Sequence, residues 1–294
     1  MKKVIFIFSL IILAATIILW AYQNNRNDDY EDIFSIKTSY SYISNNGVNF
    51  NIKVYSSKKE SLLAFGKEAE VYLHDKSEEN VIKCSVNNVY INETVLFDEN
   101  YYYEYIYDLN LDMSKLKIKE CYMKVKFENK EYDFMIGSFE IVEKKIEDNI
   151  ISISNLYGLT SDDNSKSLCG IVVTFNNIYT DSLKIDEITI GSNYKVFVNE
   201  NNIISCSESN NIYDYLPNYS RQKEETNTGI TLKRKEKVTL LLPIKYEKDF
   251  YLYNAYLLVK IGSNYCYFSN FTYIDSTDID TMNKYVIRGN INEF

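Results

Sequence analysis

The sequence contains a single histidine, His74. Any Ser-His-Asp or Cys-His nucleophilic set would depend on this one side chain, and zinc hydrolases that need two or three histidine ligands are excluded. The residues that follow, Asp75, Lys76 and the acidic pair Glu78–Glu79, are typical of an exposed strand end or turn. We therefore expect neither a catalytic nor a metal-binding role for His74.

Other motifs of common chemistries are also missing. The sequence has no G-x-x-x-x-G-K-[ST] and no G-x-G-x-x-G, which excludes the usual phosphate-binding loops. None of its cysteines forms a C-x-x-C pair, so zinc ribbons and thioredoxin-like sites are excluded. We interpret the cysteines as small buried residues, with disulfides as the alternative. The five are Cys84, Cys121, Cys169, Cys206 and Cys266. No catalytic residue, metal or cofactor is assigned.

Positive charge is in short supply. The net charge is -9 and no basic stripe with interleaved aromatic residues is present, which argues against nucleic acid as a partner. Proline (2) and glycine (9) are scarce, whereas tyrosine (28) is abundant. The Tyr-, Asn-, Ile- and Lys-rich composition is typical of proteins from AT-rich bacterial genomes. A hydrophobic content of 46% is sufficient for packed cores.

The first 22 residues contain a long apolar run. Val4–Tyr22 has only Ser9 and Thr16 as polar interruptions and carries no charge. As a helix rising ~1.5 Å per residue, this run spans roughly 28 Å, close to the hydrocarbon thickness of a bilayer. Because Lys2 and Lys3 precede it, the positive-inside rule predicts the N-terminus inside the cell and the remainder outside.

Two interpretations of this run stay open. A cleaved signal peptide has the same charged start but ends in a small-x-small site, whereas the bulky Leu19 and Trp20 precede Ala21. We favour a retained, single-pass membrane anchor over residues 1–22, followed by a polar tether over residues 23–32. The alternative is a secreted protein with the same ectodomain.

From Ile33 onward, short apolar-polar alternations are bounded by turn residues. Val48–Val54 alternates without interruption after the turn signal Asn45–Gly47, and Tyr103–Leu111 places its tyrosines and leucines on one face. Tyr122–Ile136 has the pattern of a hairpin. Short strands with turns about every ten residues are typical of antiparallel sandwiches. We therefore predict an all-β fold, with the Tyr103–Leu111 face in a core.

Three stretches recur in the same order. They are Gly47–Ile52 with Gly170–Phe175, Asn80–Ser85 with Asn202–Ser207, and Tyr122–Phe127 with Tyr256–Ile261. We interpret this recurrence as two tandem immunoglobulin-like β-sandwich domains, over residues 33–147 and 148–276, with a longer loop in the second. In the C-terminal segment, residues 277–294, apolar residues at helical spacing predict a short helix from Asp278 to Arg288. We expect it to pack on the second sandwich.

The polar loop Ser207–Gly229 is the predicted contact surface, because function concentrates in loops held by rigid sandwiches. Its candidate binding residues are Tyr213, Tyr215, Tyr219 and Arg221. Two acidic clusters, Asp162–Asn164 and Asp275–Asp280, offer oxygen ligands for calcium. Since such clusters are usually solvated turns, we assign no metal to them.

These patterns favour a non-catalytic, membrane-anchored extracytoplasmic protein. We expect it to bind a protein or cell-envelope component through the loops of its sandwiches. One alternative is a cell-wall carbohydrate-binding or carboxylate-dependent glycan-acting protein. A second is a structural spacer of an envelope complex. The expected partners are the membrane and an envelope or protein ligand, with no nucleic acid and no small-molecule cofactor.

Overall fold

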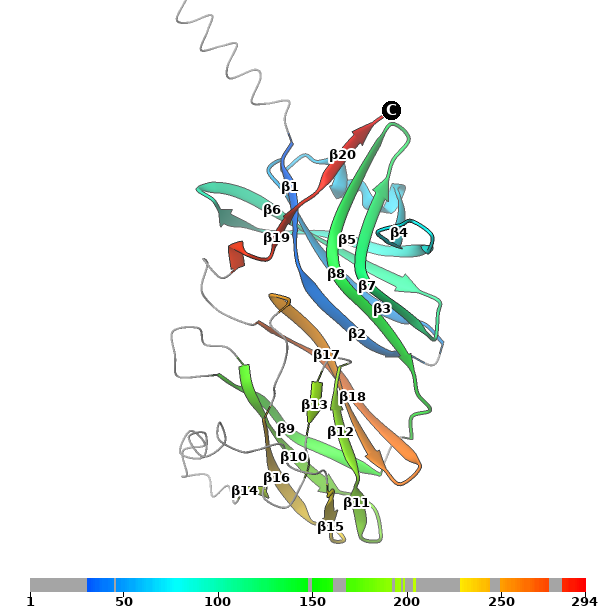
Figure 1. Ribbon diagram of the computed structural model, residues 1–294, viewed down its shortest axis with the longest axis vertical. Helices are drawn as coiled ribbons and strands as arrows, with labels where there is room; N and C mark the ends of the chain where they lie inside the picture. Colours follow the sequence, from blue (N-terminus) through cyan, green and yellow to red (C-terminus); the bar gives the residue numbers. More distant parts are fainter. Residues whose placement is uncertain are drawn as a thin grey trace, which may run out of the picture.

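The computed structural model describes residues 31–44, 46–147, 150–160, 168–191, 194–196, 198, 203–204, 228–243, 249–274 and 282–294. Apart from the 3₁₀ helix η1 (Leu62–Glu68), the named elements of these residues are all β-strands. The strands form several layered sheets (Figure 1), which confirms the predicted all-β, sandwich-like class. In this described part, no helix has the length and apolarity needed to cross a bilayer. The predicted anchor Val4–Tyr22 lies outside the described residues.

The first half of the chain, together with one strand from the C-terminal segment, forms two facing sheets. One contains, in spatial order, β19 (Val286–Arg288), β1 (Ile33–Ile36), β3 (Val48–Ser56), β6 (Asn100–Leu111) and β5 (Val81–Phe97). The other contains β2 (Thr38–Ser44), β8 (Lys130–Glu143), β7 (Leu116–Lys126), β4 (Glu70–Asp75) and the beginning of β5. The long β5 joins both sheets, because its first residues pair with β4 and its later ones with β6.

The core of this half follows from one-sided alternation. Tyr105, Tyr107 and Leu109 of β6 are fully buried, as predicted, and pack between the sheets with Phe134 and Phe139 of β8. The predicted hairpin is also present, formed by β7 and β8.

The second half has a separate core between two further layers. One layer contains, in spatial order, β9 (Ile151–Thr160), β10 (Leu168–Asn177), β16 (Lys237–Pro243) and β14 (Ile203–Ile204). The other contains β18 (Asn264–Ile274), β17 (Leu252–Ile261), β12 (Glu187–Ile190) and β13 (Tyr194–Val196). The short strands β11 (Leu183–Ile185) and β15 (Ile230–Leu232) pair with each other.

Strand order is the same in the two halves. The order β9-β10-β16-β14 corresponds, in chain sequence, to β1-β3-β6-β5, and β18-β17-β12-β13 corresponds to β8-β7-β4-β5. Two of the recurring sequence stretches lie on corresponding strands, namely β3 with β10 and β7 with β17.

The halves are joined through β2, which pairs in parallel with both neighbours. Along β8 its register runs from Thr38 opposite Gly137 to Ser44 opposite Glu143. On its other edge, Thr38, Ser39 and Tyr40 lie opposite the beginning of β17. One sheet therefore continues from the first half into the second, and β2 departs from the antiparallel pairing predicted for the sandwiches.

The predicted C-terminal helix from Asp278 to Arg288 is present only in part. Met282 and Asn283 are helical, and residues 278–281 lie outside the described residues. Val286–Arg288 is instead the strand β19, paired with β1, and Asn290–Glu293 is β20, paired with β8. The physical reason is that the edges of β1 and β8 supply backbone partners to a β-branched segment that is too short for a stable helix. The chain end therefore packs on the first half, not on the second sandwich.

The C-terminal strand is fixed by Arg288. Its guanidinium forms an ion pair with Asp32 and donates a hydrogen bond to the Tyr102 hydroxyl at 3.0 Å. It also lies over the rings of Phe34, Phe97 and Tyr102, 5.5 to 6.0 Å from their centroids. This aromatic and ionic arrangement attaches the end of the chain to the beginning of the fold.

The last residue before the fold is also held. The buried Glu31 carboxylate accepts hydrogen bonds from Ser56 at 2.7 Å and Tyr132 at 3.0 Å, and lies 3.2 Å from the Lys130 ammonium. Burial raises the pKa of Glu31, but these partners outweigh burial and the net pKa is lowered. The end of the predicted tether, Glu31 and Asp32, is thus attached to the first half.

Candidate binding site between the two halves

A pocket opens where β2 separates from β3. β1 pairs with β3, but beyond Lys37 the chain continues as β2, which pairs with β8 and β17 instead. The two strands diverge from this point, and β17 and β18 of the second half lie across the gap. We call this pocket the junction slot; it has a volume of about 320 Å³.

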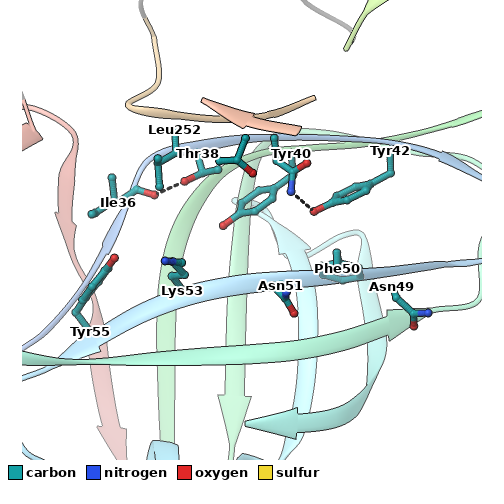
Figure 2. A pocket seen from close by; sticks show the side chains of 12 residues that line it. Ile36, Thr38, Tyr40, Tyr42, Asn49, Phe50, Asn51, Lys53, Tyr55 and Leu252 are labelled. Carbon is teal, nitrogen blue, oxygen red and sulfur yellow. Dashed lines mark hydrogen bonds between the residues drawn. The ribbon is translucent and has the colours of Figure 1, made fainter. Parts of the chain in front are cut away.

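Aromatic and amide side chains line most of the junction slot (Figure 2). The lining residues are Ile36, Thr38, Tyr40, Tyr42, Asn49, Phe50, Asn51, Lys53, Tyr55, Leu252, Asn254 and Thr272. Strict alternation along β3 explains the polar rim, because Asn49, Asn51 and Lys53 point outward while the residues between them enter the core.

The aromatic part of the slot is closely packed and uncharged. Tyr40 and Tyr42 are each 5% exposed, and their rings pack against Phe139 at centroid distances of 5.9 and 5.6 Å. Burial raises the pKa of both phenols, so they are protonated at physiological pH. Figure 2 shows both side chains extending from β2 into the space above β3.

One hydrogen bond in the slot joins the two halves directly. The Asn254 side-chain amide of β17 donates to the Tyr42 hydroxyl of β2 at 3.0 Å. Since these residues are 212 positions apart in sequence, the slot exists only when both halves are folded and docked.

Lys53 is the one cation among the described residues that line the slot, and its charge is neutralised. Lys53 lies 3.1 and 3.2 Å from the two carboxylate oxygens of Glu104, which is buried. The same carboxylate accepts hydrogen bonds from Tyr55 at 2.9 Å and Asn92 at 2.9 Å. Burial and the adjacent Glu104 charge raise the pKa of Tyr55, which is therefore a neutral donor. This network fixes the Lys53 side chain at the slot mouth.

His74 differs from its predicted exposed position. Its ring is 3% exposed and stacks on Tyr122, with centroids 5.3 Å apart. Nδ1 lies 2.7 Å from the carbonyl oxygen of Asp75, and Nε2 lies 3.1 Å from Asp133 Oδ1. The prediction failed because Tyr122 and Asp133 belong to other strands, and local composition does not reveal that they cover the ring.

His74, Glu78 and Asp133 offer ligand atoms within 4.8 Å of one another. Both ring nitrogens of His74 face acceptor oxygens, and this arrangement favours the protonated imidazolium. Burial lowers the pKa of His74, but the hydrogen bonds to Asp133 and Asp75 outweigh burial and the net pKa is raised. Glu78 is also 3.0 Å from the Lys124 ammonium. A metal ion would have to displace two positive charges, so the geometry suits an ion-pair cluster better than a metal site.

The residues predicted to bind from the long loop, Tyr213, Tyr215, Tyr219 and Arg221, lie outside the described residues. The acidic clusters at 162–164 and 275–280 also lie outside them. Two of the cysteines, Cys84 and Cys121, are free thiols buried in the first core, as predicted.

Sequence reasoning missed the junction slot. The alternation along β3 did reveal an outward row of Asn49, Asn51 and Lys53. Nothing in the sequence indicated that residues of β17 and β18 would line the same pocket as this row. The parallel pairing of β2 with β17, which creates the wall, has no local sequence signal.

Comparisons with known proteins find only weak structural similarity for this chain. No family model and no curated protein matches it. Among solved structures it is similar to the Streptococcus agalactiae AgI/II polypeptide BspA C-terminal domain, with 10% identity and a TM-score of 0.20 over 82% of this chain and 98% of that one. Two further structures, titled BspA_C_mut and BspA_C_WT, match with 8% and 9% identity and the same TM-score, over 82% of this chain and 97% and 98% of theirs. A TM-score of this size assigns neither fold family nor function.

Proposed function

We propose that the protein is a membrane-anchored, extracytoplasmic binding protein without catalytic activity, and that the junction slot is its ligand site. The observation that carries this proposal is the slot itself. It is an open pocket at the boundary of two folded halves, lined by tyrosines and amides and by a cation already paired with a carboxylate. Pockets of this chemistry and position are typical ligand sites.

The anchor is supported by the apolar run Val4–Tyr22 and by the way the fold begins. Glu31 and Asp32 are fixed to the first half by ion pairs. Residues 23–30 between run and fold extend at most roughly 29 Å. The beginning of β1 and the C-terminus lie near one another at one end of the molecule (Figure 1). An anchored chain would therefore hold the first half near the membrane and the second half farther away.

We further propose that the two halves are duplicated immunoglobulin-like sandwiches. The shared strand order and the placement of two recurring stretches on corresponding strands support this. The proposed contact loop Ser207–Gly229 follows β14 and precedes β15 in the sequence. We propose it as a second contact surface beside the slot.

Location can be tested by thiol labelling of intact cells of the source organism. Ser263 is exposed in the β17–β18 turn, so Ser263→Cys should react with a membrane-impermeant maleimide. Wild-type protein controls for the native cysteines. We expect labelling of the variant above wild type without lysis, and a mature N-terminus at Met1. Labelling of the variant only after lysis would refute the outside location, and a mature start near Tyr22 would refute the anchor.

A further inference from the structure

The charges that line the junction slot restrict the class of ligand that it can bind. Lys53 is 44% exposed at its side chain, but both oxygens of Glu104 lie within 3.2 Å of its ammonium. Among the described residues that line the slot, no other side chain is charged. An anionic ligand would meet an acidic chain and a cation that is already paired. A cationic ligand would find no carboxylate among the described residues that line the slot. The slot is suited to a neutral ligand.

The polar groups of the slot are both donors and acceptors. Asn49, Asn51 and Asn254 each carry an amide that can donate and accept, and the Tyr42 hydroxyl can do the same. Asn51 projects outward from β3, and its side chain makes no hydrogen bond to a residue that the structure describes. Groups of this kind match a ligand whose own groups also donate and accept, which is the property of hydroxyls.

The remaining surface is apolar and flat. Tyr40 and Tyr42 of β2 and Leu252 of β17 lie on one side of the slot, and Phe50 of β3 lies on the opposite side (Figure 2). Aromatic faces pack against the C–H faces of cyclic polyols while amides bond the hydroxyls at the ring edge. A volume of about 320 Å³ is at the small end of ligand pockets. It suits a small ring or the terminal unit of a longer chain.

We propose that the junction slot binds a neutral saccharide unit, with Asn51 and Lys53 at the mouth contacting hydroxyl groups and the accessible edges of Tyr40 and Tyr42 contacting the sugar ring. This inference rests on the slot being the ligand site. It identifies the ligand class as a polyhydroxylated, uncharged molecule of the kind found in cell-envelope glycans. It assigns no hydrolysis to the site.

The test uses the full-length chain in detergent micelles or nanodiscs on an array of neutral and anionic glycans. We expect binding to neutral members, and a loss of affinity of about tenfold in Asn51→Ala, equivalent to one well-made hydrogen bond. Asn129→Ala is the matched control, because Asn129 is an exposed asparagine in the β7–β8 turn outside the slot. Its affinity should equal that of wild type.

Three results would overturn the inference. They are no neutral glycan bound, a preference for anionic glycans, and equal affinity of Asn51→Ala and wild type. Circular dichroism of both variants checks that the fold is retained. If the slot binds a different class of molecule in cells, the saccharide proposal fails but the proposed function stands. Failure of the ligand class can therefore be distinguished from failure of the proposed function.

Discussion

Gly137 offers a sharp test of how the two halves are joined. It has φ +119° and lies opposite Thr38, at the point where β2 begins to pair with β8. A Cβ at this position would lie 2.0 Å from the carbonyl oxygen and 2.6 Å from the amide nitrogen of Thr38. Both are backbone atoms, so no side-chain rotation can relieve the overlap.

A control variant separates the loss of stability in Gly137→Ala into a backbone conformational cost and a steric cost. Gly262 also has positive φ, +61°, but a Cβ there would meet nothing within 4 Å. Gly262→Ala should therefore lose only the conformational term, about 1 kcal/mol. Gly137→Ala adds the displacement of β2 from β8 and from β17, and we expect a loss of about 4 kcal/mol or more in the free energy of unfolding.

The assay is thermal and urea unfolding of the full-length chain, followed by far-ultraviolet circular dichroism. At roughly 2–4 °C per kcal/mol for a chain of this size class, Gly137→Ala should lower Tm by about 8 °C or more and Gly262→Ala by about 2–4 °C. Equal shifts for the two variants would show that β2 is not seated on β8 as described.

Three further predictions concern groups outside the slot. The pKa of His74 is raised in the folded state, so its contribution to stability is complete below pH 6.5 and is lost as pH rises through the folded-state pKa. The difference in free energy of unfolding between wild type and Asp133→Asn should therefore shrink from pH 6 to pH 9. A constant difference would contradict this. Arg288→Lys keeps the charge but loses the planar contact with three rings, so urea unfolding should show a loss of about 1 kcal/mol, and no loss would argue against the ring contacts. Burial raises the pKa of Cys84 to about 12 and that of Cys121 also upward; peptide mapping after native alkylation should find both unmodified, and modification would place them at the surface.

Strands with one-sided burial could be predicted from sequence. The β6 residues Tyr105 and Tyr107 are buried and Asp108 is not, because a strand between core and solvent must alternate. The Val48–Val54 strand and the β7–β8 hairpin follow for the same reason.

Features that depend on distant partners could not be predicted. Ile279, Met282, Tyr285 and Val286 have the spacing of a helix, and pairing with the edge of β1 makes Val286–Arg288 a strand. The slot likewise requires the meeting of Tyr42 and Asn254, far apart in sequence and without a local signal. The amide row of β3 was visible, but its function depends on a wall that the other half supplies.

The most direct test of the central claim is site-specific photo-cross-linking in intact cells of the source organism. A photoreactive amino acid replaces Asn51 at the slot mouth or, as a control, Ser263 in the exposed β17–β18 turn. If the slot is the ligand site of an extracytoplasmic binding protein, position 51 should yield a cross-linked envelope component and position 263 should not. Cross-linking at neither position, or equal cross-linking at both, would contradict the assignment.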